Sequence, residues 1–97
     1  MLSKKLNEMG FNTRRGQQYS GIGGEDVVGI DGVHIECKYT DRGHGMLYDW
    51  MAQAVRDSDG KIPMVMHKKV SEKSRGNEWL VTMRLEDIKA LLHDEIL

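Results

Sequence analysis

The chain has 97 residues, which suits one domain with a single modest core, and 39% of them are hydrophobic. Charged residues make up 30% and nearly cancel, which excludes a disordered tail and a uniformly basic nucleic-acid coat. One cysteine excludes an internal disulfide and is typical of a reducing compartment. The sequence has no apolar run of transmembrane length and no signal peptide, so we expect a cytoplasmic protein without a membrane partner.

The first third of the chain predicts a short helix and then a strand. Leu2, Leu6 and Met9 recur at helical spacing, and Gly10 is placed to end the helix. Residues 11–19 lead into the strand. The glycines that follow indicate a turn rather than a phosphate cradle, because no Walker lysine and no following helix accompany them.

A hairpin over residues 26–38 comes next, and the remaining elements follow from periodicity. The expected apolar stripe of a middle helix is Leu47, Met51, Ala54 and Val55, with Trp50 at its edge. A buried strand through Met64-Val65-Met66, a polar turn over 71–77 and an alternating strand of Trp79, Val81 and Met83 come after it. Leu85, Ile88, Leu92 and Ile96 predict a final amphipathic helix. The sequence therefore predicts a single α/β domain over residues 1–97, a mixed central sheet flanked by helices.

The hairpin sorts its side chains by chemistry. Because side chains alternate along a strand, Val33, Ile35, Cys37 and Tyr39 share one face, and His34, Glu36 and Lys38 share the other. The first set is apolar and predicts a core face. The second set places the Glu36 carboxylate beside the Lys38 ammonium, with the His34 imidazole next to them.

The turn decides whether Asp26 joins this polar face. A two-residue turn at Asp31-Gly32 would place Asp26 opposite Cys37, on the wrong side. A three-residue loop, Ile30-Asp31-Gly32, would place Asp26 opposite Glu36, and Gly32 stands where such a loop needs a left-handed residue. A bulge near Gly29 would give the same shift. We favour the arrangement in which the two carboxylates and the lysine converge.

Two carboxylates beside a lysine are suited to phosphodiester hydrolysis. Mg²⁺ prefers a few carboxylate oxygens and keeps several waters, and it can polarise the phosphorus centre and a bound water. A neighbouring ammonium can orient that water and neutralise developing charge. Without further context, a cross-strand ion pair on a solvated sheet face is the commoner origin of such a pattern.

Further motifs stand in order along nearly the whole chain. They are Gly10-Phe11, Arg14, Gly23-Gly24-Glu25-Asp26, Glu36-Cys37-Lys38, Trp50-Met51-Ala52-Gln53-Ala54, residues 63–69 and Trp79-Leu80-Val81-Thr82-Met83. This ordered set resembles the PD-(D/E)XK nuclease superfamily, and within it the small phage Holliday junction resolvase-like proteins and the virus-type replication-repair nucleases.

The resemblance implies a restriction-endonuclease-like core and metal-dependent cleavage of branched DNA, in the host cytoplasm if the chain is phage-encoded. It implies that Asp26, Glu36 and the Cys37 backbone carbonyl bind Mg²⁺, and that Mn²⁺ would substitute for it. It also implies that Lys38 is the catalytic lysine. Gln53 matches a glutamine near the site of many members, although it could equally be a boundary hydrogen-bonding residue. Glu25 stands at the proline position of the motif.

One departure concerns the first helix. Related nucleases carry a glutamate there, about three turns before the Gly-Phe pair, and the matching position would precede Met1. Glu8 lies too close to Gly10 to take its place. A catalytically silent DNA-binding module on the same scaffold is therefore an alternative, as are a sequence-specific restriction-type enzyme and a structural interaction domain.

The remaining expectations concern binding and minor sites. A four-way junction needs two matched cuts, so we expect a homodimer. Cys37 is expected to be a small hydrophobe, His34 a spectator near the metal and His44 a solvated loop residue. Basic residues that could contact phosphates, or simply form solvated faces, are Arg14, Arg15, Lys68, Lys69, Lys73 and Arg75.

Overall fold

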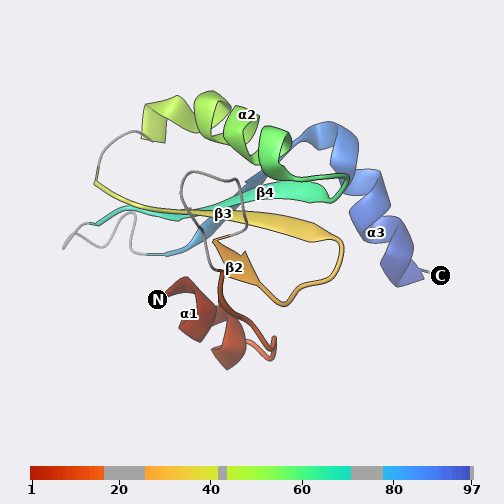
Figure 1. Cartoon of the computed structure of the whole chain (residues 1–97), viewed down its shortest axis with the longest axis horizontal. Coiled ribbons are helices and arrows are strands. Elements are labelled where there is room, and N and C mark those ends of the chain that lie inside the picture. The colour runs from red at the N-terminus through yellow and green to blue at the C-terminus, as the bar shows by residue number, and fades with distance from the viewer. Residues whose placement is uncertain (17–25, 42–43, 71–77, 97) are drawn as a thin grey trace.

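A five-stranded mixed sheet, in the order β1-β2-β3-β4-β5, runs through the centre of the protein (Figure 1). The structure is a computed structural model that describes residues 1–16, 26–41, 44–70 and 78–96, with side chains as far as residue 92. β3 and β4 are parallel, and the other neighbouring pairs are antiparallel. The strands are β1 (Arg14–Arg15), β2 (Val27–Val28), β3 (Val33–Tyr39), β4 (Ile62–Lys68) and β5 (Leu80–Met83), and the helices are α1 (Leu2–Glu8), α2 (Leu47–Asp57) and α3 (Ile88–Ile96). The predicted α/β class is confirmed.

The helices α1 and α2 cover opposite faces of the sheet (Figure 1). The core on the α1 face consists of Leu2 and Leu6 packed against Val27, Val33, Ile35, Met64 and Met66. A smaller core on the α2 face joins Trp50, Met51 and Ala54 to Val65. Alternation along β3 and β4 produces this division, because odd residues of β3 and even residues of β4 point toward α1.

The hairpin between β2 and β3 has the predicted register. Val27 pairs with Ile35, which is the register that the three-residue loop gives, while the Asp26 N–H bonds to the Ile35 carbonyl and Oδ2 of Asp26 accepts from the Cys37 N–H. Asp26 does not join the group of close ligand atoms that contains Glu36, so the expected convergence of the two carboxylates is not found among the described residues. Gly32 has a φ of 78°, the left-handed conformation expected at the third position of the loop. The three-residue loop is therefore confirmed, and it sets which side chains face each other across the strands.

Gly29 lies where the hairpin passes close to the segment before β1. Its φ is 123°, and an added Cβ would stand 2.4 Å from the backbone oxygen of Asn12. We expect Gly29→Ala to lower the free energy of unfolding by about 3 kcal/mol, because both the strain and the backbone clash must be relieved. Gly32→Ala, where an added Cβ meets open space, is the matched control and should cost about 1 kcal/mol in urea denaturation. Equal losses in the two variants would contradict the prediction.

The final helix differs from its prediction. Leu85, Ile88 and Leu92, expected on its buried stripe, are exposed, and Leu91 packs against the α1-face core instead. A 3-10 turn over Leu85–Asp87 precedes α3 and shifts which residues face the sheet. The side chain of Ile96 lies outside the described part. Within the described residues, none of the helices is long and apolar enough to cross a membrane.

Candidate functional site

The polar face of β3 lies against α2 rather than in solvent. Glu36 is only 1% exposed, and His34 is equally buried. The solvated Glu–Lys ion pair considered from the sequence does not form, because each of these groups has a different partner. The polar residues of this face therefore constitute a buried site with defined contacts.

Glu36 is held by His34. The Nε2 atom of His34 lies 2.9 Å from Oε1 of Glu36, within the buried layer between β3 and α2. Burial raises the pKa of the Glu36 carboxyl, and the nearby carboxylates of Asp26 and Asp57 raise it further, while the hydrogen bond from His34 opposes them. His34, expected to be a spectator, is instead the direct partner that orients Glu36.

Lys38 reaches across to α2. Its Nζ donates a hydrogen bond of 3.2 Å to Oε1 of Gln53 and lies 6.0 Å from the centre of the Trp50 ring. Gln53 therefore points toward Lys38, and this bond agrees both with a residue near the site and with a boundary hydrogen-bonding residue. The ammonium group is therefore fixed by a neutral acceptor and is not neutralised by Glu36.

Asp26 immediately precedes β2. Its Oδ2 accepts a hydrogen bond of 2.7 Å from the backbone N–H of Cys37, and so replaces the backbone acceptor that a longer β2 would provide. In a strand, the N–H and C=O of one residue point to the same side. The Cys37 carbonyl therefore faces the edge where the Asp26 carboxylate lies. The Cys37 side chain is half-buried, and burial together with the charge of Asp26 raises the pKa of its thiol.

Asp57 is a candidate ligand that the sequence analysis missed. Possible ligand atoms of His34, Glu36 and Asp57 lie within 4.8 Å of one another, and Asp26 is not in this group. The available signal was helical spacing, since Asp57 follows Gln53 by one turn of α2 and so shares its face. Because the tertiary packing of α2 on β3 was not predicted, that signal could not be connected with Glu36.

His44, Trp50 and His67 form an aromatic cluster beside Lys38 on the same face. The His44 ring lies 5.2 Å from that of Trp50 and 5.1 Å from that of His67, so the prediction of a solvated loop histidine was wrong. Nε2 of His67 lies 2.8 Å from the Thr82 hydroxyl. Burial, and then the nearby His44, lower the pKa of His67, which keeps this imidazole neutral at pH 7.

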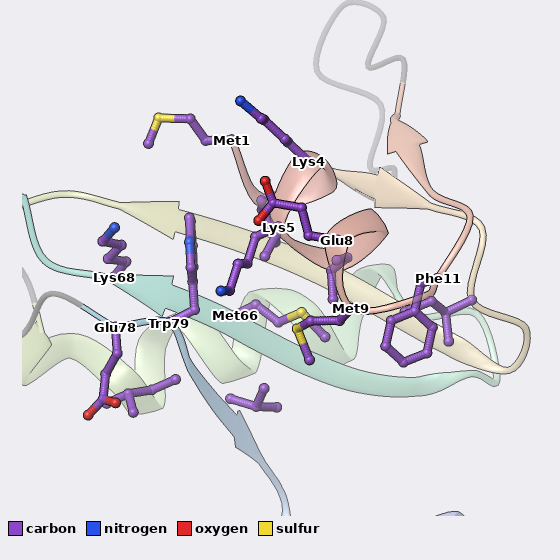
Figure 2. Close-up of a pocket in the computed structure, with 15 residues that line it drawn as sticks. Met1, Lys4, Lys5, Glu8, Met9, Phe11, Met66, Lys68, Glu78 and Trp79 are labelled. Atoms are coloured by element: carbon purple, nitrogen blue, oxygen red, sulfur yellow. The ribbon is translucent and has the colours of Figure 1, made fainter.

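Two of the predicted phosphate-binding residues, Arg15 and Lys68, border hollows on the α1 face of the sheet. Arg14 and Arg15 are exposed, and Arg15 borders a hollow of about 530 Å³ together with Asp26 and Cys37. Lys68 lies on the α1 face, beside Trp79 in a groove that Lys4 and Lys5 also line (Figure 2). Lys69 is exposed. Lys73 and Arg75 lie outside the described residues, as do Glu25 and the glycines before it.

The donor set of this site fits a divalent cation. Carboxylate and carbonyl oxygens, such as those of Asp26, Glu36 and Cys37, are the hard ligands that Mg²⁺ prefers, but Asp26 is not in the group of close ligand atoms that contains Glu36. Asp57 and the imidazole of His34 lie close enough to Glu36 to add a carboxylate and a nitrogen, which would also suit Mn²⁺. No protein-family model and no curated protein matches this chain.

Proposed function

We propose that the protein is a metal-dependent endonuclease that hydrolyses phosphodiester bonds in branched DNA, with four-way junctions as the preferred substrate. The proposal takes the restriction-endonuclease-like arrangement as its scaffold. The observation that carries it is the group of close ligand atoms of His34, Glu36 and Asp57, the first two on the strand that also supplies Lys38 and that Asp26 contacts through the Cys37 N–H.

The residues of the site would have two separate roles, metal binding and stabilisation of the phosphate. Asp26, Glu36 and the Cys37 carbonyl would hold Mg²⁺, with Asp57 and His34 available next to Glu36. When bound, the cation supplies Lewis acidity toward a phosphate oxygen and lowers the pKa of a water. Lys38, oriented by Gln53, would neutralise charge that develops on the phosphate and orient the attacking water.

Arg15 supports the same substrate class. It is exposed and borders the hollow that also contains Asp26 and Cys37, on the opposite face of β3 from Glu36 and Lys38, so a phosphate in this hollow would meet a guanidinium group beside Asp26. Phosphate contacts position a duplex without reading its sequence, which suits an enzyme that recognises DNA shape. The adjacent Arg14 would extend this basic edge.

Cleavage of labelled DNA tests the proposal. With Mg²⁺, the protein should cut a four-way junction faster than a linear duplex of equal strand concentration, and a chelator should stop the reaction. Lys38→Met should abolish cutting, whereas Lys89→Met, which removes an exposed lysine of α3, should leave it unchanged. Cutting that survives both the chelator and Lys38→Met would refute the nuclease assignment. Equal rates on the two DNAs would favour a restriction-type enzyme.

A catalytically silent DNA-binding module is the second candidate. The observation that favours it is the burial of Glu36 and its hydrogen bond to His34, which together satisfy the carboxylate without a metal. Calorimetric titration with Mn²⁺ separates the two functions. The enzyme should bind the ion in a manner that depends on Asp26, and the silent module should bind junction DNA without binding Mn²⁺.

A further inference from the structure

β5 is an outer strand of the sheet, and its surface is apolar. Leu80–Met83 contains no charged residue, and Leu80 and Val81 are 51% and 55% exposed. Edge strands of soluble proteins are ordinarily protected by charges, proline, bulges or a covering element, because their unpaired N–H and C=O groups bind other strands. The side chains of β5 include no charge and no proline, and β5 is the last strand of the sheet that the described residues form, so its outer edge can pair with another strand.

A groove lies on each side of this edge. On the α1 face, a groove of about 810 Å³ has an apolar part that includes Met66, Trp79 and Val81, and Figure 2 shows β5 running away from α1, which lies over β3 and β4. The same groove is also lined by the charged residues Lys4, Lys5, Glu8, Lys68 and Glu78. On the α2 face, a groove of about 710 Å³ lies between α2 and β5. It is bordered by Tyr48 and Leu85, which are 92% and 84% exposed. A partner that pairs with β5 would cover both grooves at once.

The charges that flank β5 identify a second copy of this chain as that partner. Glu78 precedes the strand, and Arg84 follows it in extended backbone conformation, with φ −73° and ψ 139°. In an antiparallel pair of two copies centred on Val81, Glu78 of each copy stands opposite Arg84 of the other. Trp79 then faces Met83, and Val81 faces itself. Sliding the pairing by one residue removes both ion pairs.

The orientation of the side chains agrees with this symmetry. Val81 pairs with Met66 and Met83 pairs with Met64, so both point to the α1 face, and by alternation Trp79 does too. A two-fold axis perpendicular to the sheet keeps the α1 faces of both copies on one side. The apolar contacts Trp79–Met83 and Val81–Val81 therefore lie on a single continuous face.

We propose that the protein forms a two-fold symmetric dimer through antiparallel pairing of β5 with β5 of a second copy, centred on Val81. The pairing satisfies the free strand edge and joins the grooves of the two copies into shared apolar surfaces. It is tested independently of the nuclease function, because the experiments below measure the oligomeric state and not cleavage. Two residues of β5 and its flank do contact the candidate site, since Trp79 borders the hollow with Asp26 and Thr82 contacts His67. If the chain is a nuclease, the same axis relates two sites as a four-way junction requires.

Sedimentation velocity over a range of concentrations tests the dimer. The wild-type protein should sediment as a dimer at micromolar concentration, and Val81→Arg, which places two guanidinium groups at the axis, should be monomeric. Val70→Arg, at an equally exposed valine beyond the end of β4, is the matched control and should remain dimeric. Circular dichroism shows whether each variant is folded. A monomeric wild type, or a dimer that persists in Val81→Arg, would overturn the proposal.

Charge reversal tests the register without depending on the folding of Val81→Arg. Glu78→Arg should weaken dimerisation by about tenfold in Kd, since each new arginine faces Arg84 of the other copy. The double variant Glu78→Arg/Arg84→Glu should recover most of the affinity. The intrachain bonds of Arg84 to Asp87 are lost in the double variant, so Arg84→Glu alone supplies the reference. Failure of the double variant to exceed both single variants would overturn the register.

Disulfide trapping gives a second, independent measurement. Opposed residues of an antiparallel pair have Cβ atoms about 5 Å apart, close enough for Val81→Cys to form an intermolecular disulfide under mild oxidation. Val70→Cys has the same native Cys37 background and should stay monomeric on a non-reducing gel. Equal trapping of the two variants would contradict pairing at Val81.

Discussion

Replacing Glu36 by glutamine is expected to slow metal-dependent DNA cleavage by about 10³-fold or more. The amide is neutral and is a weaker ligand for a hard divalent cation than the carboxylate. Its oxygen can still accept a hydrogen bond from Nε2 of His34, so the contact that now stands at 2.9 Å is retained. Single-turnover cleavage of a labelled four-way junction measures the loss. A rate within a few-fold of the wild type would exclude Glu36 as a metal ligand.

The pH dependence of stability provides the folding control for this variant. Because burial raises the pKa of Glu36 above its ordinary value of 4.5, the native state binds this proton more tightly than the unfolded chain does. The stabilisation is fully present below pH 4.5 and is lost as the pH rises through the folded-state pKa. Glutamine does not titrate, so Glu36→Gln should become more stable relative to the wild type over that interval. Urea denaturation of both proteins at several pH values measures this difference in stability. The prediction would be contradicted if Glu36→Gln became less stable relative to the wild type as the pH rises.

Asp26→Asn is expected to produce an equally large loss of cleavage, about 10³-fold, without unfolding the hairpin. The asparagine oxygen can still accept the hydrogen bond from the Cys37 N–H, but the charge that would hold the cation is gone. Asp26→Ala removes the acceptor as well and should cost a further 1 kcal/mol or so of stability, because a part-buried N–H loses its partner.

The two substitutions at Asp26 separate its roles when compared by cleavage, Mn²⁺ calorimetry and denaturation. Asp31→Asn, in the exposed loop of the same hairpin, is the control and should resemble the wild type in all three. If the Asp26→Asn variant binds Mn²⁺ as tightly as the wild type, the role of Asp26 is limited to its hydrogen bond with the Cys37 N–H. In that case His34, Glu36 and Asp57 would be the remaining candidate metal ligands.

Several local features could be predicted because neighbouring residues determine them. The left-handed Gly32 selects the three-residue loop, and the loop length selects the register, so the pairing of Val27 with Ile35 followed from turn chemistry. Gln53 stands at the border of the apolar stripe of α2, which allowed it to point toward Lys38. In the structure it does so. These inferences required only one strand pair or one helix.

Features that depend on packing between distant segments were missed. Asp57 joins His34 and Glu36 only because α2 lies across β3, and periodicity does not specify that alignment. His44 lies in a glycine-rich segment that looked solvated, yet its ring packs against Trp50 and His67. The stripe of Leu85, Ile88 and Leu92 predicted for the last helix is exposed, because a 3-10 turn precedes α3 and Leu91 packs against the core instead.

By itself, the sequence determined the α/β class, the alternation that separates an apolar face from a polar one, and the register of the hairpin that carries Asp26 and Glu36. Only the tertiary structure decided that the polar face is buried under α2, that Glu36 pairs with His34 and Lys38 with Gln53, and that β5 is the last strand of the described sheet. The reason is physical. Turn geometry and strand alternation act over a few bonds, whereas desolvation and the choice of hydrogen-bond partner depend on which distant element packs against each face.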